Sequence, residues 1–166
     1  MEQTLIIFKP DAVQRGIVGE IVIRFERAGF KIVGIKMLEP GYDHYHAHYE
    51  GIGTLKTRKG DEIFESTLSS MQEGPVIAMV LEGVEAVETV RKMVGSTEPR
   101  SALPGTIRGD FAHVTYGQAS STGKGVANIV HASADTTEAN KEVAHWFKPE
   151  EIHKYSAVHE HFTQPK

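Results

Sequence analysis

The sequence has no cysteine among its 166 residues, which excludes disulfide frameworks and thiolate metal sites. It also has no apolar run near the roughly 20 residues that span a bilayer, and its first residues do not resemble a signal peptide. An excess of positive charge is missing too, because the net charge is −4, and this disfavours a general nucleic-acid-binding surface. These absences predict a cytoplasmic protein with no membrane segment and no specific nucleic acid partner.

The composition is otherwise that of a globular protein, with 40% hydrophobic and 24% charged residues. The length suits a single domain with a proper core, which we expect over residues 1–157, followed by a C-terminal tail at 158–166. Apolar runs predict strands at 5–8, 30–38, 76–81 and up to His131. The run at 76–81 is the most apolar, so we expect it to be central in the sheet.

Helical spacing of apolar residues predicts helices between these strands and after the last one. Asp135 followed by Glu138 is a capping-box pattern for the last long helix. We expect loops in the segments rich in glycine, serine or proline, which are 51–61, 96–110 and 117–125. Alternating strands and helices predict a mixed α/β fold, with helices covering a four-stranded sheet of split βαβ type.

The segment from Asn128 to Ser133 is the most informative part of the chain. It places His131 at the edge of a buried strand, just before the next helix begins. Helix N-termini favour phosphate, and the free ring nitrogen of a neutral histidine can attack phosphorus. Taken alone, His131 could equally be a packed or surface histidine.

Phosphate chemistry also needs cations, and three stand at the edges of predicted elements. Lys9 ends the first strand and is held extended by Pro10. Arg91 lies on the helix after the third strand, and Arg108 closes a long loop. Taken singly, each of these could be an ordinary solvated charge.

Four motifs in this order resemble the nucleoside diphosphate kinase family, and the resemblance runs from about Gln3 to Tyr155. The motifs are KPDAVQRG at 9–16, PGTIRGDF at 104–111, NIVHAS at 128–133 and WFKPEE at 146–151. The resemblance implies a ferredoxin-like fold with a four-stranded antiparallel sheet. It also implies a ping-pong reaction, in which a nucleoside triphosphate such as ATP phosphorylates the enzyme and a nucleoside diphosphate then takes the phosphate. Mg²⁺ is expected to arrive on the nucleotide phosphates, so no protein metal ligand is expected.

The resemblance also assigns roles to individual residues. His131 would be the nucleophile that becomes phosphohistidine on Nδ1, with Glu142 and Ser133 orienting it and tuning its acidity. The positions that match phosphate and ribose contacts are Lys9, Arg91, Thr97, Arg108 and Asn128. Tyr49 matches a tyrosine near the phosphates, and either Ile63 or Phe64 would meet the base. From the residues alone, Ser133 and Asp135 compete to cap the last helix.

Three features depart from the family pattern. Ala132 follows the histidine where glycine is usual, and would cost about 1 kcal/mol if that backbone needs a positive φ. The segments 51–61 and 112–127 are longer than usual. Because 112–127 would border subunit contacts, the expected homo-oligomer could be a hexamer, a tetramer or a dimer.

Two other interpretations compete with the kinase. His44 and His48 are four residues apart on a predicted helix, but no carboxylate or cysteine completes a zinc set nearby, which favours a polar helix surface. The chain could also be a catalytically impaired, nucleotide-binding or regulatory member of the same fold. The presence of His131, Lys9, Arg91 and Arg108 favours the enzyme.

Overall fold

The structure is a computed structural model that describes residues 1–163. Four strands form one antiparallel sheet in the order β2-β3-β1-β4. The strands are β1 (Glu2–Phe8), β2 (Lys31–Leu38), β3 (Val76–Gly83) and β4 (Val130–Ala132). The expected sheet is therefore confirmed, and β3 is indeed an inner strand.

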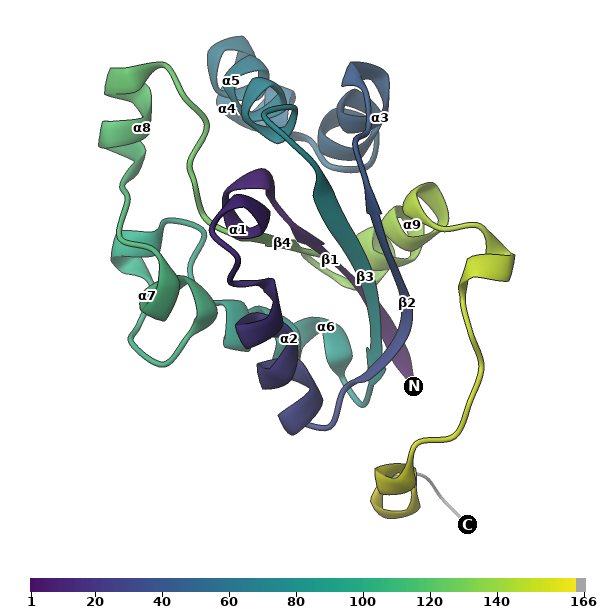
Figure 1. Ribbon diagram of the computed structural model, residues 1–166. Coiled ribbons are helices and arrows are strands. Elements are labelled where there is room, and N and C mark those ends of the chain that lie inside the picture. The colour runs from purple at the N-terminus through teal and green to yellow at the C-terminus, as the bar shows by residue number, and fades with distance from the viewer. Residues whose placement is uncertain (164–166) are drawn as a thin grey trace.

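Helices cover both faces of the sheet (Figure 1). The α-helices are α1 (Pro10–Gln14), α2 (Val18–Arg27), α3 (Tyr42–His46), α4 (Leu55–Lys59), α5 (Asp61–Met71), α6 (Ala86–Val94), α7 (Ile107–Phe111), α8 (Tyr116–Thr122) and α9 (Thr136–Trp146). A π-helix, η1 (Ala47–Ile52), continues α3, and three short 3₁₀ helices are η2 (Pro99–Ser101), η3 (Pro149–Glu151) and η4 (Val158–Phe162).

The core has one half on each face of the sheet, which explains why the strands are apolar runs without strict alternation. On one face, Ile6 and Phe8 of β1 pack with Phe25 of α2 and with α6. On the other face, Leu5 and Ile7 pack with side chains of α3, α5 and α9. β1 is thus buried on both sides, and the residues that directly follow it are held rigidly.

Three segments that we expected to be loops contain helices. In 51–61, the carboxylate of Glu50 accepts hydrogen bonds from the backbone nitrogens of Lys56 (2.7 Å) and Thr57 (3.2 Å), which satisfies the free donors at the start of α4. In 112–127, the hydroxyl of Thr115 caps α8 by accepting from Gln118 N at 3.0 Å. The loop expected at 96–110 likewise contains η2 and α7.

The C-terminal segment runs beside β2. The backbone nitrogen of His153 donates to Val33 O at 2.8 Å, and the hydroxyl of Tyr155 donates to Ile32 O at 2.7 Å. The described part of the expected tail, up to residue 163, includes η4, and the rest of the tail lies outside the described residues. No described helix is long and apolar enough to cross a membrane.

Candidate active site

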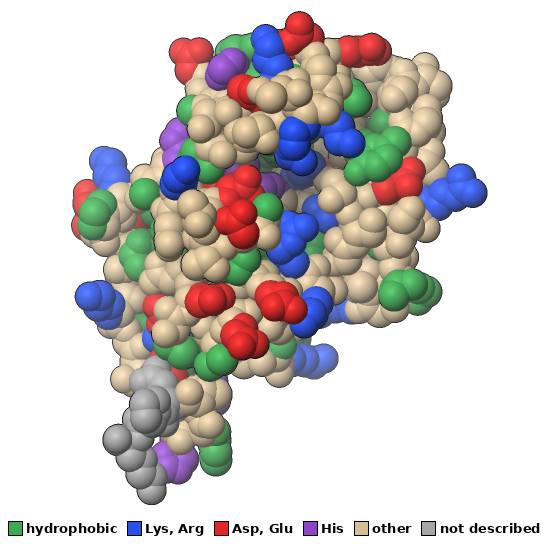
Figure 2. Space-filling view, turned by 180° about the vertical axis from the view of Figure 1, so that it is seen from behind, with side chains coloured by type: hydrophobic (Ala, Val, Ile, Leu, Met, Phe, Trp, Pro, Cys, Tyr) green, Lys and Arg blue, Asp and Glu red, His purple; other side chains and the backbone are tan. Residues whose placement is uncertain are grey.

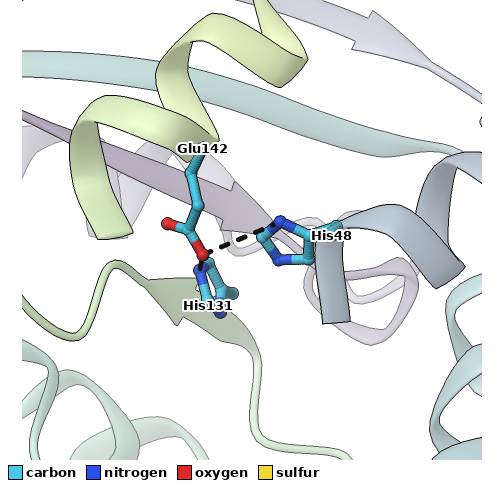
Figure 3. A group of neighbouring side chains, drawn as sticks. All are labelled: His48, His131 and Glu142. Carbon is cyan, nitrogen blue, oxygen red and sulfur yellow. Dashed lines mark hydrogen bonds and ion pairs between the residues drawn. The ribbon is translucent and has the colours of Figure 1, made fainter. Parts of the chain in front are cut away.

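His131 lies in the middle of β4, opposite Ile7 of β1, and lines a cleft of about 1300 Å³. Its Nε2 atom is 2.8 Å from Oε1 of Glu142 on α9 (Figure 3). When Nε2–H donates to this carboxylate, the lone pair of the ring is on Nδ1. The arrangement therefore leaves the Nδ1 lone pair without a partner among the described residues, so Nδ1 is the ring atom that could act as a nucleophile.

Glu142 is itself held in place by Ser133, which lies just before α9. Only 1% exposed, it accepts a 2.6 Å hydrogen bond at Oε2 from the hydroxyl of Ser133, and this hydroxyl accepts from Leu5 N at 3.1 Å. Asp135 caps α9 by accepting from Glu138 N at 2.8 Å. The competition between the two possible caps is thus resolved: Asp135 serves the helix, and Ser133 links Glu142 to β1.

His48 belongs to this cluster, although the sequence did not single it out as a neighbour of the nucleophile. It is buried on the π-helix η1, its ring centroid is 4.6 Å from that of His131, and its Nδ1 accepts from the indole nitrogen of Trp146 at 3.1 Å. Burial, with a smaller contribution from nearby His131, holds the pKa of His48 well below its usual value. His48 is therefore neutral, and its ring forms one wall of the site.

The ligand atoms of His48, His131 and Glu142 lie within 4.8 Å of one another, as in a small metal site. However, the lone pair of His48 Nδ1, 3.7 Å from Glu142 Oε1, already accepts the indole N–H, and one lone pair cannot serve both partners. His44 stacks on His145 instead, with ring centroids 4.0 Å apart. These contacts make the cluster a hydrogen-bonded network.

Lys9 is one of three cations that line the cleft near His131, together with Arg91 and Arg108. Its ammonium donates to the amide oxygen of Asn128 at 2.6 Å, and the amide nitrogen of Asn128 donates to Thr97 O at 2.8 Å. Burial lowers the pKa of Lys9 to about 8, against the opposing effect of Asp11 and together with that of Arg108. Lys9 is thus a cation with a neutral partner, in a place that disfavours its charge.

Arg108 is only 7% exposed and donates to three backbone carbonyls, those of Gly95 (3.0 Å), Asn128 (3.1 Å) and Val130 (2.5 Å). Burial, followed by the charge of Arg91, lowers its pKa to about 10. Arg91 reaches two carbonyls at the end of β4 at 3.4 Å. Within residues 1–163, no carboxylate lies within 4.0 Å of these arginines or of the Lys9 ammonium, so their charges are available to an anion.

Ala132 does not need the backbone conformation that favours glycine. Among non-glycine residues in the described part of the chain, only Glu85 and Ile129 have positive φ. Alanine therefore fits at this position without backbone strain.

The strained residue is Ile129, with φ of 73°. Val130 N donates to Asn128 O at 2.8 Å across it, which closes a γ-turn of the rare positive-φ form. The turn is held at both ends, because Lys9 N donates to Ile129 O at 2.8 Å and Ile129 N donates to a carboxylate oxygen of Asp11 at 3.1 Å. Strain of this kind persists only where the surroundings enforce it, and here it lies two residues before His131.

Four further residues were named from the sequence. Tyr49 and Thr97 line the cleft, and burial raises the pKa of Tyr49. Ile63 also lines it and is 43% exposed, whereas Phe64 is fully buried in the core and lies outside the cleft lining. The next position on a helix points in a different direction, so Phe64 cannot meet a ligand there, and Ile63 is the one of the pair that the cleft presents.

The cleft thus combines one nucleophilic nitrogen with three cations that have no carboxylate partner, an arrangement that suits phosphoryl transfer. Figure 2 shows lysine and arginine side chains gathered around a hollow in this surface.

Comparison with known proteins agrees with this chemistry. The nucleoside diphosphate kinase family matches residues 2–152. A nucleoside diphosphate kinase from Pyrococcus furiosus is 43% identical over 166 residues, all of this chain and 95% of the relative. A solved nucleoside diphosphate kinase from Borrelia burgdorferi, a transition state mimic with vanadate and ADP, has a TM-score of 0.92 and 40% identity over 96% of this chain and 94% of that one. A halophilic enzyme from Halobacterium salinarum in complex with CDP has a TM-score of 0.83 and 32% identity over 99% of both chains.

The chain belongs to the nucleoside diphosphate kinase family. It is a transferase that moves phosphate from a nucleoside triphosphate to a nucleoside diphosphate.

Proposed function

We propose that this transfer follows a ping-pong mechanism through a phosphohistidine on Nδ1 of His131. The observation that carries the proposal is the 2.8 Å contact between His131 Nε2 and Glu142, because it leaves the Nδ1 lone pair free at the cleft. Nδ1 forms a bond to the γ-phosphorus while the bond from phosphorus to the bridging oxygen breaks, and the nucleoside diphosphate leaves with that oxygen. A second nucleoside diphosphate then attacks the same phosphorus, and His131 recovers its lone pair.

The other residues position the phosphates and stabilise charge. Lys9, Arg91 and Arg108 face the transferring group and its leaving oxygen, where fixed cations act most strongly. Asn128 and Thr97 sit beside Lys9 and hold phosphate and ribose, Tyr49 borders the phosphates, and Glu142 with Ser133 orients the histidine. Ile63 borders the base. The catalytic unit spans residues 1–157.

Mg²⁺ fits this site as an ion that is bound by the phosphates of the nucleotide. The carboxylates that line the end of the cleft near His131 already accept hydrogen bonds: Glu142 from Ser133 and His131, Asp11 from Ile129 N, and Glu138 from Ala134 N. Mg²⁺ usually keeps its waters and binds substrate phosphates. When bound to the nucleotide it neutralises phosphate charge. No protein ligand to it is proposed.

The decisive experiment is single-turnover labelling with γ-labelled ATP and Mg²⁺, quenched with EDTA. Acid-labile, base-stable label should appear on the protein and move to GDP in a chase. The His131→Ala variant should take no label while still binding ADP, whereas the matched control His153→Ala, an exposed histidine, should label normally. Label on His131→Ala would identify another nucleophile. ATP binding without any label would instead support the regulatory alternative.

We also propose that the protein assembles as a homo-oligomer through β2. This edge strand exposes Ile35 (54%) and Met37 (58%), and its outer edge beyond Val33 carries the backbone groups that edge strands use to pair. Light scattering should give a mass of two or more chains, and Met37→Asp should reduce it. A wild-type mass of 18.3 kDa would contradict the proposal. A cytoplasmic location is part of the proposal, and cell fractionation tests it.

A further inference from the structure

Asp11 is an acidic residue in the first turn of α1, and it lines the cleft together with Lys9. A carboxylate in a first helical turn commonly stabilises its own helix through the helix dipole. The side chain of Asp11 makes a further contact, because its Oδ2 accepts a hydrogen bond from Ile129 N at 3.1 Å. The two residues are 118 positions apart, so this bond ties α1 to the segment that leads into β4.

The hydrogen bond from Ile129 to Asp11 supports a strained turn. Ile129 has φ of 73° and is 0% exposed, so its backbone N–H has no access to water. Without the carboxylate this N–H would be an unpaired buried donor, which is costly. A strained turn persists only where its surroundings enforce it. We therefore expect the turn to relax when Asp11 loses its acceptor oxygen.

The same turn holds two cations at the end of the cleft near β4. Lys9 is attached twice, because its backbone nitrogen donates to Ile129 O at 2.8 Å and its ammonium donates to the amide oxygen of Asn128 at 2.6 Å. Arg108 is also attached twice, since it donates to the carbonyls of Asn128 (3.1 Å) and Val130 (2.5 Å). The histidine of β4 is the next residue in the chain. A shift of the turn would therefore displace both cations and the histidine together.

Asp11 also acts on Lys9 through its charge. Burial and the charge of Arg108 both lower the pKa of Lys9, whereas the charge of Asp11 raises it. Two other neighbours are neutral: Asn128 is an amide, and burial holds the pKa of His48 on η1 well below its usual value. Since the Asp11 carboxylate lies more than 4.0 Å from the ammonium, it favours the cation without pairing with it.

We propose that Asp11 is a positioning residue for phosphoryl transfer, which holds the strained turn at Ile129 and keeps Lys9 charged. Through its hydrogen bond it fixes where Lys9, Arg108 and Asn128 meet the phosphates. Through its charge it partly offsets the burial of Lys9 before the nucleotide arrives. The inference rests on the proposed function, because it requires that phosphate binds at Lys9.

The hydrogen bond is tested by single-turnover labelling of three variants with γ-labelled ATP and Mg²⁺. In Asp11→Ala the rate of label formation should fall by about tenfold to a hundredfold, the effect that a displacement of about 1 Å can have. Asp11→Asn keeps an oxygen acceptor for Ile129 N and should stay within about threefold of wild type. The matched control is Asp43→Asn, which should label normally. Asp43 is also the second residue of a five-residue helix but lies outside the cleft.

The charge is tested by the pH dependence of ADP binding, measured by titration calorimetry between pH 6 and 9. At pH 6, Asp11→Asn should bind ADP at least as tightly as wild type, because Lys9 is protonated in both and one negative charge near the phosphates is gone. As pH rises, its affinity should fall at a pH about half a unit to one unit lower than in wild type. Asp43→Asn should keep the wild-type profile. In a Lys9→Met background, Asp11→Asn should cause no such shift.

Either of two results would overturn the inference. Label formation in Asp11→Ala within about threefold of wild type would show that the turn does not need the carboxylate. An unshifted binding profile in Asp11→Asn would remove the role of the charge. If Asp11→Ala does not fold, as judged by circular dichroism, the Asp11→Asn profile still decides. If the wild type takes no label, the proposed function has failed, and the binding profiles of the same variants still test Asp11.

Discussion

Lys9, at the end of β1, and Lys31, at the start of β2, are both largely enclosed by protein, but their partners differ. Lys31 is 7% exposed and contacts Glu82 at 2.8 Å and Glu160 at 2.7 Å. Hydrogen bonds to Glu160 and Glu82 raise its pKa. Lys9 instead contacts an amide oxygen, that of Asn128, and burial lowers its pKa to about 8.

The difference separates a structural cation from the cation that we propose contacts phosphate. The charge of Lys31 is neutralised within the protein, so it ties β2 and β3 to the C-terminal segment. The charge of Lys9 is held without a neutralising carboxylate contact, and a phosphate would supply what is missing. The protein thus tolerates an unfavourable cation at the place where we propose that phosphate binds.

The largest expected effect comes from Lys9→Met. The rate of phosphate transfer should fall by roughly 10²–10³-fold, because a fixed cation near the transferring group is lost. The free energy of unfolding should change by less than about 1 kcal/mol, since Asn128 loses one partner but a desolvated charge is removed. Steady-state kinetics and urea denaturation measure the two effects. A rate within about threefold of wild type would remove Lys9 from the site.

Lys31→Met should show the opposite pattern. It leaves Glu82 and Glu160, which are 19% and 12% exposed, without their cation. The free energy of unfolding should fall by about 2–3 kcal/mol, somewhat less than for a fully buried pair, with kcat/KM within about twofold of wild type. A matching loss of activity at a temperature where the variant is folded would mean that the two regions are not independent.

The pH dependence sharpens the comparison. As pH rises through about 8, free Lys9 loses its proton, so nucleotide affinity should fall by several-fold. Lys31→Met should keep this profile, and Lys9→Met should lose it.

At acid pH, the free energy of unfolding depends on a different group, Glu82. Because the folded pKa of Glu82 is lowered, its contribution to stability is present above pH 4.5 and is lost as pH falls through the folded value. Titration calorimetry and thermal melts over pH 3–9 give both curves.

The smallest effect is expected for Tyr155→Phe, which removes the hydroxyl that donates to Ile32 O at 2.7 Å. Because this tyrosine is half exposed, the loss should be about 0.5 kcal/mol or less, with no change in kcat/KM. A loss above about 2 kcal/mol would show that the C-terminal segment supports β2 more strongly than the Lys31 contacts alone.

Local pattern was sufficient to predict much of the fold. Apolar runs located all four strands, and the Asp135–Glu138 spacing located the start of α9. Two of the missed helices depend on polar contacts that periodicity does not report: α4 needs the carboxylate of Glu50, and α8 has glycine and serine in its interior but is capped by Thr115.

For the candidate site, motifs pointed to residues but not to how they are held. Sequence spacing could not tell whether Glu142 faces His131, since this depends on the contact of Ser133 with Leu5, 128 residues away. His48 was missed as a site residue because its partner, Trp146, is 98 residues away. Contacts of this kind come from tertiary packing.

The γ-turn at Ile129 also decides how the last strand can fold. β4 has only three residues, and a shift of one residue along β1 would turn the imidazole of His131 to the opposite face of the sheet. Three paired residues alone specify such an alignment weakly. The carbonyl and amide of Ile129 are bound to Lys9 N and Asp11, so the turn docks in a single position. The contacts of this strained residue therefore fix the register of β4 against β1, and this register sets the face of the sheet on which His131 lies.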